Sequence, residues 1–586
     1  MTTTARGRPS WIAPFVIALA LRLWGLGEVP TTLTIDEAHL GYEAWSIVRA
    51  VGQGHAPQSG EVGPCPLGTY AVALSVGLFG PTPIAVRLPF ALAGSLSVVP
   101  LAVIGEALIG TRVAGAAAAL LLATSPWHLA FTRVARDGTW LVFGLILMVA
   151  GLIGVGARAR RRGWLPPVGL TVVGAAIATI GDPIGAIAAG TTAIAVGFSL
   201  AAARPPIVLP GRKLLQRGMS NHIRAYAEDE SFPSQGERAG TSSPSRRLAR
   251  GEGVAARVAA ALLTVAVLVA PYAAVPGAIP FGPEREARAE AEATSAKRLA
   301  ADSSGITGVF QESWAVLGRA ALAAYASHLD LTFLTTRGDA DKRNHPTGFG
   351  QLSLIDLPLV VAGALLALQA GWSRRPSGVE APRWGVVIAW LAVAPLPAAI
   401  AVSNADATRS IGMVPALALL EAGAIAAVWP RVVARRVTFE ARLVVGVTTV
   451  AWALATAVHD PVEAGRAFGA GAFAGFEWAR MEVEAGRAAQ VVVVSDASQA
   501  VEAARLALRV DPLARVQATT LAGRRDDERV DVREVVDWAN ERREASAASR
   551  LYALHGAARV PEGFAVAHVA KTGDGRPIVT FVRVSP

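Results

Sequence analysis

The chain has 586 residues, of which 52% are hydrophobic and 17% are charged, and its formal net charge at pH 7 is +10. Soluble domains carry about 25% charged residues, so this composition favours a membrane protein. The basic residues cluster in short loops between apolar runs, which is typical of the positive-inside rule and argues against a nucleic-acid partner. A single cysteine, Cys65, excludes an intramolecular disulfide and a cysteine-based metal site.

Apolar stretches that approach or exceed the roughly 17 to 25 residues needed to cross a bilayer recur along the chain. They lie at 11–27, 88–109, 113–126, 140–157, 165–180, 184–202, 254–275, 351–371, 384–403, 410–429 and 441–458. We therefore expect a mainly α polytopic membrane protein with about eleven transmembrane helices. The first stretch is expected to be an uncleaved spanning helix, and the shorter run at 67–80 predicts an interfacial helix.

The distribution of charge predicts which loops lie on which side of the membrane. With the N-terminus in the cytoplasm, every expected cytoplasmic loop is basic. The outer loops are then 28–87, 276–350 and several short connections. They hold nearly all the acidic residues that stand in candidate motifs. Segment 203–253 has little periodic apolarity and predicts a disordered basic cytoplasmic insertion, which is either a solvated linker or a contact for anionic lipid headgroups.

After residue 466 the composition changes, and residues 466–586 predict a small extracytoplasmic α/β domain beside a transmembrane domain of residues 1–460. The patterns predict strands at 489–496, 514–521 and 549–556, helices at 498–510 and 532–545, and a final pair of strands within 564–585 joined by an Asp574-Gly575 turn. This region has no phosphate loop, nucleophile elbow or metal-ligand spacing. Its expected role is structural, or the docking of an acceptor.

The stretch "TLTIDEAHLGYEAWSIV" at 32–48 places two adjacent acids where the first apolar segment has ended. Leu40, Ala44 and Ile47 follow at helical spacing, which predicts an amphipathic helix over 36–51 in the outer membrane interface. Asp36 would lie at or near the N-cap of this helix. Helix capping alone explains an acid at that position, so a structural role and a catalytic role both remain open.

Three further outer segments gather ionisable residues. They are "SPWHLAFTRVARDGTW" with His128, Arg133, Arg136 and Asp137, residues 328–350 with Arg337, Asp339, Arg343 and His345, and "NADATRSIG" with Arg409. Ionisable groups at membrane depth are costly and are retained mainly where they pair or line a polar cavity. Each cluster alone is equally explained as a solvated interfacial loop.

Four blocks, taken together and in this order, resemble the bacterial dolichyl-phosphate-mannose protein mannosyltransferase-like family. They are "DEAHLGYEAW", "RLPFALAGSL…LLATSPWHLAFTR", "GDADKRNHPTGFGQLSLIDLPLVVAG" and "DATRSIGMVPALALL", and the resemblance covers roughly residues 10–430. It implies an integral-membrane glycosyltransferase of the C-type fold in the bacterial inner membrane. Such an enzyme moves a sugar from a polyprenyl-phosphate donor, among the membrane lipids, to an acceptor hydroxyl on the extracytoplasmic face. The acceptor (protein, lipid or glycan), the sugar and the carrier length stay open.

The resemblance maps the catalytic acid onto Asp36, with Glu37 beside it, and the family's basic-then-acidic motif onto Arg133 and Asp137. A carboxylate that accepts the proton of the acceptor hydroxyl accelerates transfer by roughly 10² to 10⁴. The fork of donors on arginine suits the leaving phosphate, for which Arg133 is the first candidate. The catalytic candidates are therefore Asp36, Glu37 and Asp137. Further candidates are Arg409 and Arg343 for the donor phosphate, and His128, Tyr42 and His345 for substrate contact.

The chain departs from the family pattern at two places. The usual lysine before a Pro-Pro step is absent from "GPCPLGTY", and the usual histidine is absent from the block around Arg409. Two alternatives therefore stand beside the enzyme: a transporter or flippase of a lipid-linked substrate, and an inactive scaffold for envelope assembly. No cofactor or metal is expected, although Asp36 and His39 are spaced for a carboxylate–histidine cation site.

Overall fold

The computed structural model describes residues 9–29, 33–54, 66–158, 165–182, 184–202, 313–345, 350–353, 356–372, 384–400, 405–434, 472–494, 506–507, 525–527, 530–533, 550–555, 560–571 and 577–584. Several sequence predictions fall outside these residues. They are the spans at 254–275 and 441–458, the insertion at 203–253, the strand at 514–521 and the Asp574-Gly575 turn.

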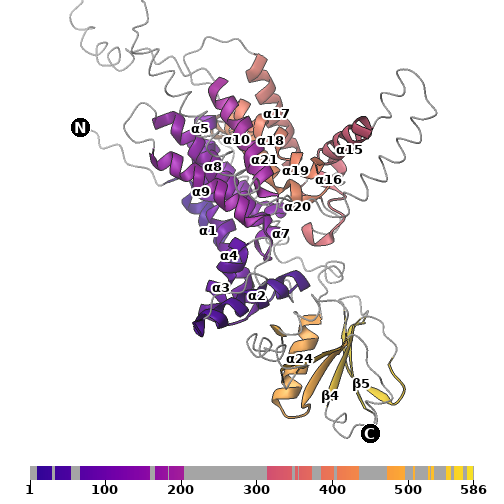
Figure 1. Ribbon diagram of the computed structural model, residues 1–586. Helices are drawn as coiled ribbons and strands as arrows, with labels where there is room; N and C mark the ends of the chain where they lie inside the picture. Colours follow the sequence, from indigo (N-terminus) through magenta and orange to yellow (C-terminus); the bar gives the residue numbers. More distant parts are fainter. Residues whose placement is uncertain are drawn as a thin grey trace, which may run out of the picture.

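The described part of the chain is mainly helical, with one small sheet near its C-terminal end (Figure 1). The helices of the membrane part are α1 (Ile12–Leu23), α2 (Ile35–Gly52), α3 (Pro66–Phe79), α4 (Pro83–Leu96), α5 (Val98–Ile109), α6 (Arg112–Thr124), α7 (Pro126–Thr132), α8 (Gly138–Arg158), α9 (Leu165–Gly181), α10 (Gly185–Ala202), α15 (Ser313–Ser327), α16 (Leu331–Thr335), η1 (Lys342–Asn344), α17 (Asp356–Trp372), α18 (Trp384–Val393), α19 (Leu396–Ile400), α20 (Ala407–Ser410), η2 (Ile411–Met413) and α21 (Val414–Ala434). The prediction of a mainly α polytopic protein with a small α/β domain is confirmed.

Three helical stretches in the described residues are long and apolar enough to cross a membrane: Pro83–Ile109, Gly138–Val155 and Ala407–Pro430. Helices α6 and α7 would count as a fourth span together, but they are bent by 56° relative to each other. Six shorter apolar helices accompany them, among them α3, which the sequence placed at the interface. The number of about eleven crossings stays a prediction.

The bend between α6 and α7 follows from Ser125 and Pro126. Pro126 has no N–H to continue the hydrogen-bond ladder of α6, but it fits the first position of a new helix. The Ser125 side chain accepts a hydrogen bond from the backbone N–H of His128 and so caps α7. Trp127 then fixes α7 to α20, because its Nε1–H donates to the carbonyl of Ala407 at 3.2 Å. The chain therefore bends by 56° at this end of the bundle before it reaches residues 133–137.

Helices α2 and α3 cross one end of the bundle, between it and the C-terminal domain (Figure 1). A capping box starts α2: the Thr34 hydroxyl accepts from the Glu37 N–H, and the Glu37 carboxylate accepts from the Thr34 N–H. One apolar cluster joins α2, α3 and α4 to the C-terminal domain. At its centre Leu506 lies directly on Gly41, where a Cβ would be 2.9 Å from the leucine methyl group.

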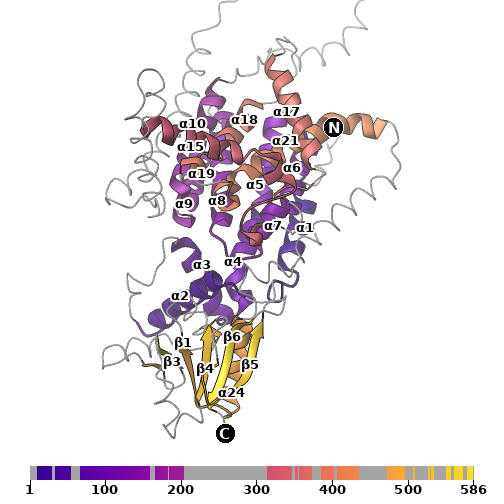
Figure 2. The same ribbon diagram turned by 90° about the vertical axis from the view of Figure 1, so that its right-hand side faces the viewer.

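The described residues of the C-terminal domain include helix α24 (Ala472–Glu484) and a six-stranded sheet beside α2 (Figure 2). The strands are β1 (Gln490–Val494), β2 (Arg525–Asp527), β3 (Val530–Arg533), β4 (Arg550–His555), β5 (Phe564–Lys571) and β6 (Pro577–Val584), in the order β2-β3-β1-β4-β6-β5. Strand β1 pairs in parallel with β3 and β4, whereas β6 pairs antiparallel with β4 and β5.

Most of the strand predictions for this domain are confirmed, namely those for β1, β4, β5 and β6. The prediction of a helix from Val532 is wrong at its start, because Val532 and Arg533 end β3 and pair with Val493 and Val494 of β1. Strand β2 and helix α24 were not predicted. Of the helix expected at 498–510, the described residues Leu506 and Ala507 are helical.

Candidate functional site

The two adjacent acids Asp36 and Glu37 lie in different surroundings. The side chain of Asp36 is 61% exposed, whereas Glu37 is 1% exposed. Glu37 receives two hydrogen bonds from Arg87, at 2.7 and 3.2 Å, and one from the backbone N–H of Ala135 at 3.2 Å. With the capping bond from Thr34, both carboxylate oxygens are occupied. Glu37, which we expected beside the catalytic acid, therefore joins α2 to α4 and to the turn after α7.

Burial works against ionisation of Glu37, but Arg87 and the two backbone donors outweigh it and hold the pKa of this carboxyl below its ordinary value. Arg87 is itself fully buried, and its Nη1 also donates to the carbonyl of Leu26 at 3.2 Å. The buried ion pair thus fixes the first turn of α2, which carries Asp36.

Asp36 pairs with Arg343, which lies 307 residues later in the chain. Its carboxylate accepts from Arg343 Nη1 at 3.2 Å. On its other edge, Arg343 donates from Nε to both carboxylate oxygens of Asp341, at 3.0 and 2.9 Å, and Nη2 lies 2.9 Å from the same carboxylate. The Asp341 carboxylate also accepts from the Arg343 backbone N–H, so this Asp-x-Arg turn holds its own guanidinium in place.

Arg136 joins the same cluster from the turn between α7 and α8. Its Nη1 donates to Asn344 Oδ1 at 2.7 Å, and Nη2 donates to Asp341 Oδ2 at 3.3 Å. The guanidinium also lies over the ring of Phe131, 5.4 Å from the centroid. Two arginines and two aspartates from three distant segments are therefore in direct contact, and we call Asp36, Arg136, Asp341 and Arg343 the Asp/Arg cluster.

The pKa values in this cluster move in the directions that its contacts dictate. Partial burial would raise the pKa of Asp341, but hydrogen bonds from Arg343 and the charge of Arg136 hold it below its ordinary value. Burial and the positive charge of Arg343 lower the pKa of Arg136. Burial lowers the pKa of Arg343, but the hydrogen bonds and negative charge of Asp341 have the larger effect and raise it. The Asp341 carboxylate is thus stabilised in its ionised form between the two arginines.

Asp339 connects the Asp/Arg cluster to α20. Its carboxylate accepts from Asn344 Nδ2 at 2.6 Å and from the backbone N–H of Ala407 at 2.9 Å. His345 is 4% exposed. Its Nε2 lies 3.0 Å from the carbonyl oxygen of Asp339, and its ring packs against Gly338. His345, predicted to contact substrate, is therefore part of the fold of this loop.

A second group of acids interacts around Asp182. Asp182 follows α9, and burial together with the carboxylates of Asp137 and Asp406 raises its pKa to about 8. Its carboxylate accepts from the backbone N–H of Ile184 at 3.0 Å. The positive charge of Arg409 acts in the opposite direction and lowers the pKa of Asp182. The side chain of Arg409 is 43% exposed, and its Nε lies 3.7 Å from Asp406 Oδ2. The charges of the predicted residues Asp137 and Arg409 thus act on Asp182.

Arg133 lies apart from both groups. It is 3% exposed, and its Nη1 and Nη2 donate to carbonyls at the end of α1 and just beyond: Leu21 at 2.6 Å, Trp24 at 2.9 Å and Val29 at 3.1 Å. These are carbonyls that a helix end leaves without intrahelical donors. Arg133, our first candidate for the donor phosphate, is committed to the C-terminal end of α1.

His128 and Tyr42, both predicted to contact substrate, are buried in the interior. His128 is fully buried, and its Nδ1 lies 2.8 Å from Nη2 of Arg22, a buried arginine of α1. Tyr42 is 2% exposed and packs edge-on against Trp45 in the cluster beneath the C-terminal domain. Neither side chain faces the Asp/Arg cluster.

Asp341, Asn344 and Asp182 had no predicted role, and the sequence held only weak signals for them. The Asp-x-Arg spacing at 341–343 marks an Asx-type turn, and Asp182 follows a glycine at the end of an apolar run. Nothing in either pattern names its distant partners. Within the described residues no three His, Cys, Asp or Glu side chains are grouped to hold a metal ion, and His39 pairs with Glu43 at 3.2 Å.

The family model for dolichyl-phosphate-mannose-protein mannosyltransferases matches residues 62–197. No curated protein matches the chain. Among solved structures, ArnT from Cupriavidus metallidurans bound to undecaprenyl phosphate is 12% identical, with 98% of each chain covered and a TM-score of 0.46. The apo form of ArnT is 14% identical, with 97% of each chain covered and a TM-score of 0.33. The segment that contributes Arg87, Arg136, Asp137 and Asp182 is thus matched by the mannosyltransferase family model, which confirms over residues 62–197 the family resemblance seen in the sequence.

Proposed function

We propose that this protein is a membrane glycosyltransferase that moves a sugar from a polyprenyl-phosphate donor to an acceptor hydroxyl. The observation that carries the proposal is the Asp/Arg cluster: an exposed carboxylate, Asp36, in contact with an arginine, at the end of an apolar helical bundle. The family match over residues 62–197 supports the same reaction class.

Asp36 is the proposed general base. As the acceptor oxygen forms its bond to C1 of the sugar, the bond from C1 to the phosphate oxygen breaks, and its electron pair leaves with the polyprenyl phosphate. The hydroxyl proton passes to the Asp36 carboxylate. A positioned base of this kind contributes about 10² to 10⁴ to the rate. Glu37, with both oxygens occupied, supports Asp36 and takes no part in proton transfer.

Arg343 and Arg136 are the proposed phosphate-binding residues, in place of Arg133. Arg343 is about a quarter exposed and contacts Asp36 through one terminal nitrogen only. A partly exposed ion pair is worth at most about 1 kcal/mol, so the anionic donor can compete for this arginine and release Asp36 for the acceptor. Both guanidiniums then face the negative charge that develops on the leaving phosphate.

The charge bias of the loops supports an N-terminus in the cytoplasm, with the Asp/Arg cluster and the C-terminal domain outside. We therefore place the reaction at the extracytoplasmic face of a bacterial inner membrane. Helix α2 carries Asp36 and contacts the C-terminal domain through Gly41 and Leu506, so the domain is suited to guide an acceptor toward the cluster.

The test uses full-length protein in lipid nanodiscs, supplied with a panel of polyprenyl-phosphate sugars and total envelope acceptors. Release of polyprenyl phosphate is measured, since it reports transfer of any sugar. We expect Asp36→Asn to lower release at least 100-fold, while Glu43→Gln, on the same helix, leaves it unchanged. Release by Asp36→Asn at the wild-type rate contradicts the base assignment. Uptake of a labelled donor into vesicles without any release would identify a transporter instead.

A further inference from the structure

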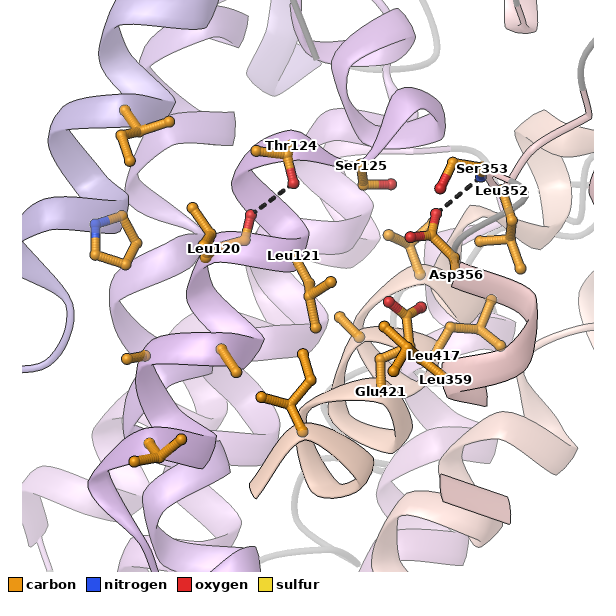
Figure 3. Close-up of a pocket in the computed structure, with 18 of the residues that line it drawn as sticks. Leu120, Leu121, Thr124, Ser125, Leu352, Ser353, Asp356, Leu359, Leu417 and Glu421 are labelled. Carbon is orange, nitrogen blue, oxygen red and sulfur yellow. Dashed lines mark hydrogen bonds between the residues drawn. The ribbon is translucent and has the colours of Figure 1, made fainter. Parts of the chain in front are cut away.

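An apolar groove lies within the membrane part of the protein and has no role in the proposed reaction. It has a volume of about 530 Å³ and lies between α1, α6, α17 and α21. Its lining residues are overwhelmingly apolar, with leucine, isoleucine, valine and alanine side chains from all four helices (Figure 3). An apolar ligand chain therefore fits the groove by its chemistry.

Two carboxyl groups interrupt this apolar lining. Glu421 of α21 is 3% exposed, lines the groove and accepts no hydrogen bond from any described residue. Asp356, at the start of α17, lies beside it and accepts from the backbone N–H of Ser353 at 2.8 Å (Figure 3). Among the described residues that line the groove there is no lysine, arginine or histidine. A buried carboxyl group without a partner is costly, so its retention at membrane depth indicates a ligand or a polar function.

The groove also differs in polarity between its two ends. Thr124, Ser125 and Ser353 lie at the end near Asp356, whereas Ile425 and Trp429 lie at the other. Along α21, the lining from Val414 to Trp429 extends about 22 Å at 1.5 Å per residue. Trp429, at that end, is 39% exposed. The two acids and three hydroxyl groups therefore gather toward one end of the groove, while Ser10, which donates to Glu106, is a further polar lining residue.

We propose that this groove binds an amphiphile with a primary amine head and a single apolar chain. The ammonium group would pair with Asp356 and Glu421, and the chain would lie along α6 and α21 toward Trp429. Charge complementarity favours this occupant, since the described residues of the groove offer two carboxyl groups and no cation. A polyprenyl-phosphate donor would bring its negatively charged phosphate against these two acids. The groove is therefore distinct from the proposed donor site, which is the Asp/Arg cluster.

The experiment uses full-length protein in phosphatidylcholine nanodiscs and dodecylamine carrying a photoactivatable diazirine near the end of its chain. After illumination, mass spectrometry measures labelling of the α6 and α21 peptides. We expect labelling that unlabelled dodecylamine displaces and that dodecanol and dodecanoate displace at least tenfold less well. Glu421→Gln should lower labelling about tenfold or more. Leu365→Ala, at a 61% exposed position of α17 outside the groove, should not change it.

Asp356→Asn is the second variant, for use if Glu421→Gln fails to insert, and the same loss is expected. Equal displacement by the amine and the alcohol would overturn the proposal, and so would unchanged labelling in the variant that inserts. In either case the groove would recognise an apolar chain alone.

Discussion

At the scale of single residues, Asp36 and Glu37 show how neighbours of the same chemical type acquire different roles. Both are acids in the first turn of one helix, yet one is 61% exposed and the other 1% exposed. Arg87, fifty residues away, makes the difference. The sequence indicated the pair and its position at the start of a helix. It could not indicate which of the two acids forms a buried ion pair, because that depends on a distant partner.

The buried pair predicts that Glu37→Gln destabilises the protein far more than Asp36→Asn. The glutamine would leave the Arg87 guanidinium buried without a counter-charge, at a cost of about 3 to 5 kcal/mol. Thermal unfolding in detergent would measure this as a clearly lower midpoint for Glu37→Gln and a small change for Asp36→Asn. Similar midpoints for the two variants would contradict the anchoring role of Glu37.

Asp182 predicts a dependence of stability on pH. Its pKa of about 8 in the folded protein lies well above the value near 4 expected for the unfolded chain. The folded state therefore retains a proton that the unfolded state has lost, and stability falls as pH rises from about 4 to about 8. Asp182→Asn removes this ionisation and keeps an oxygen for the Ile184 N–H.

The measurement is the unfolding midpoint of the wild type and of Asp182→Asn between pH 4 and pH 9. We expect the variant to become progressively more stable than the wild type as pH rises, with a constant difference above about pH 8. A difference that is the same at every pH would show that Asp182 ionises normally in the folded protein.

Asp341 predicts a kinetic effect, given the proposed reaction. Asp341→Asn would remove the carboxylate that holds Arg343 and Arg136, and we expect kcat/KM for the lipid donor to fall about 10- to 100-fold. Asp341→Glu should recover part of the loss. Asp330→Asn, at the exposed N-cap of α16, is the matched control. Equal activity of Asp341→Asn and the control would show that Asp341 has no role in the site.

At the scale of elements, the sequence predicted helices and strands well where one pattern spans the whole element. The amphipathic stretch predicted at 36–51 is α2, Ile35–Gly52, and the run at 67–80 is α3. Shorter elements depended on distant contacts. Helix α7 is held by Trp127 on α20, and β3 is held by pairing with β1. Arg133 and Arg136 face different partners for the same reason, since the turn after α7 directs one to α1 and the other to η1.

The capping box predicts the contribution of Thr34 to α2. Thr34→Ala would remove the acceptor for the Glu37 N–H and should destabilise the protein by about 1 kcal/mol. Ser46→Ala, within the same helix, is the control. Because the first turn of α2 carries Asp36, hydrogen exchange at residues 35–38 should also speed up in Thr34→Ala. Unchanged exchange there would show that the Arg87 contact alone holds the turn.

At the scale of the whole molecule, α2 is in contact with the C-terminal domain on one side and the bundle on the other (Figure 2). Gly41 permits this arrangement, because a Cβ there would lie 2.9 Å from both Leu506 and Val86. The sequence predicted the domain from its change of composition. It could not predict the docking, which depends on a residue without a side chain.

Gly41→Leu should therefore separate the C-terminal domain from α2 and expose the apolar cluster between them. Limited proteolysis would reveal faster release of the domain from nanodisc-embedded protein. Gly52→Leu, on the same helix but with open space around it, is the matched control. Equal release from both variants would contradict the docking contact.

The four donors around Glu37 also restrict which substitutions natural selection can accept at this position. Glutamine would turn its NH2 group toward one of the two backbone N–H groups and one nitrogen of Arg87, and aspartate is one methylene too short to reach Ala135 and Arg87 together. Even an exchange of charge with position 87 would set a cation against those backbone donors. Divergent descendants of this chain should therefore keep glutamate at this position across changes of substrate, while Asp36 varies wherever a lineage gives up the reaction.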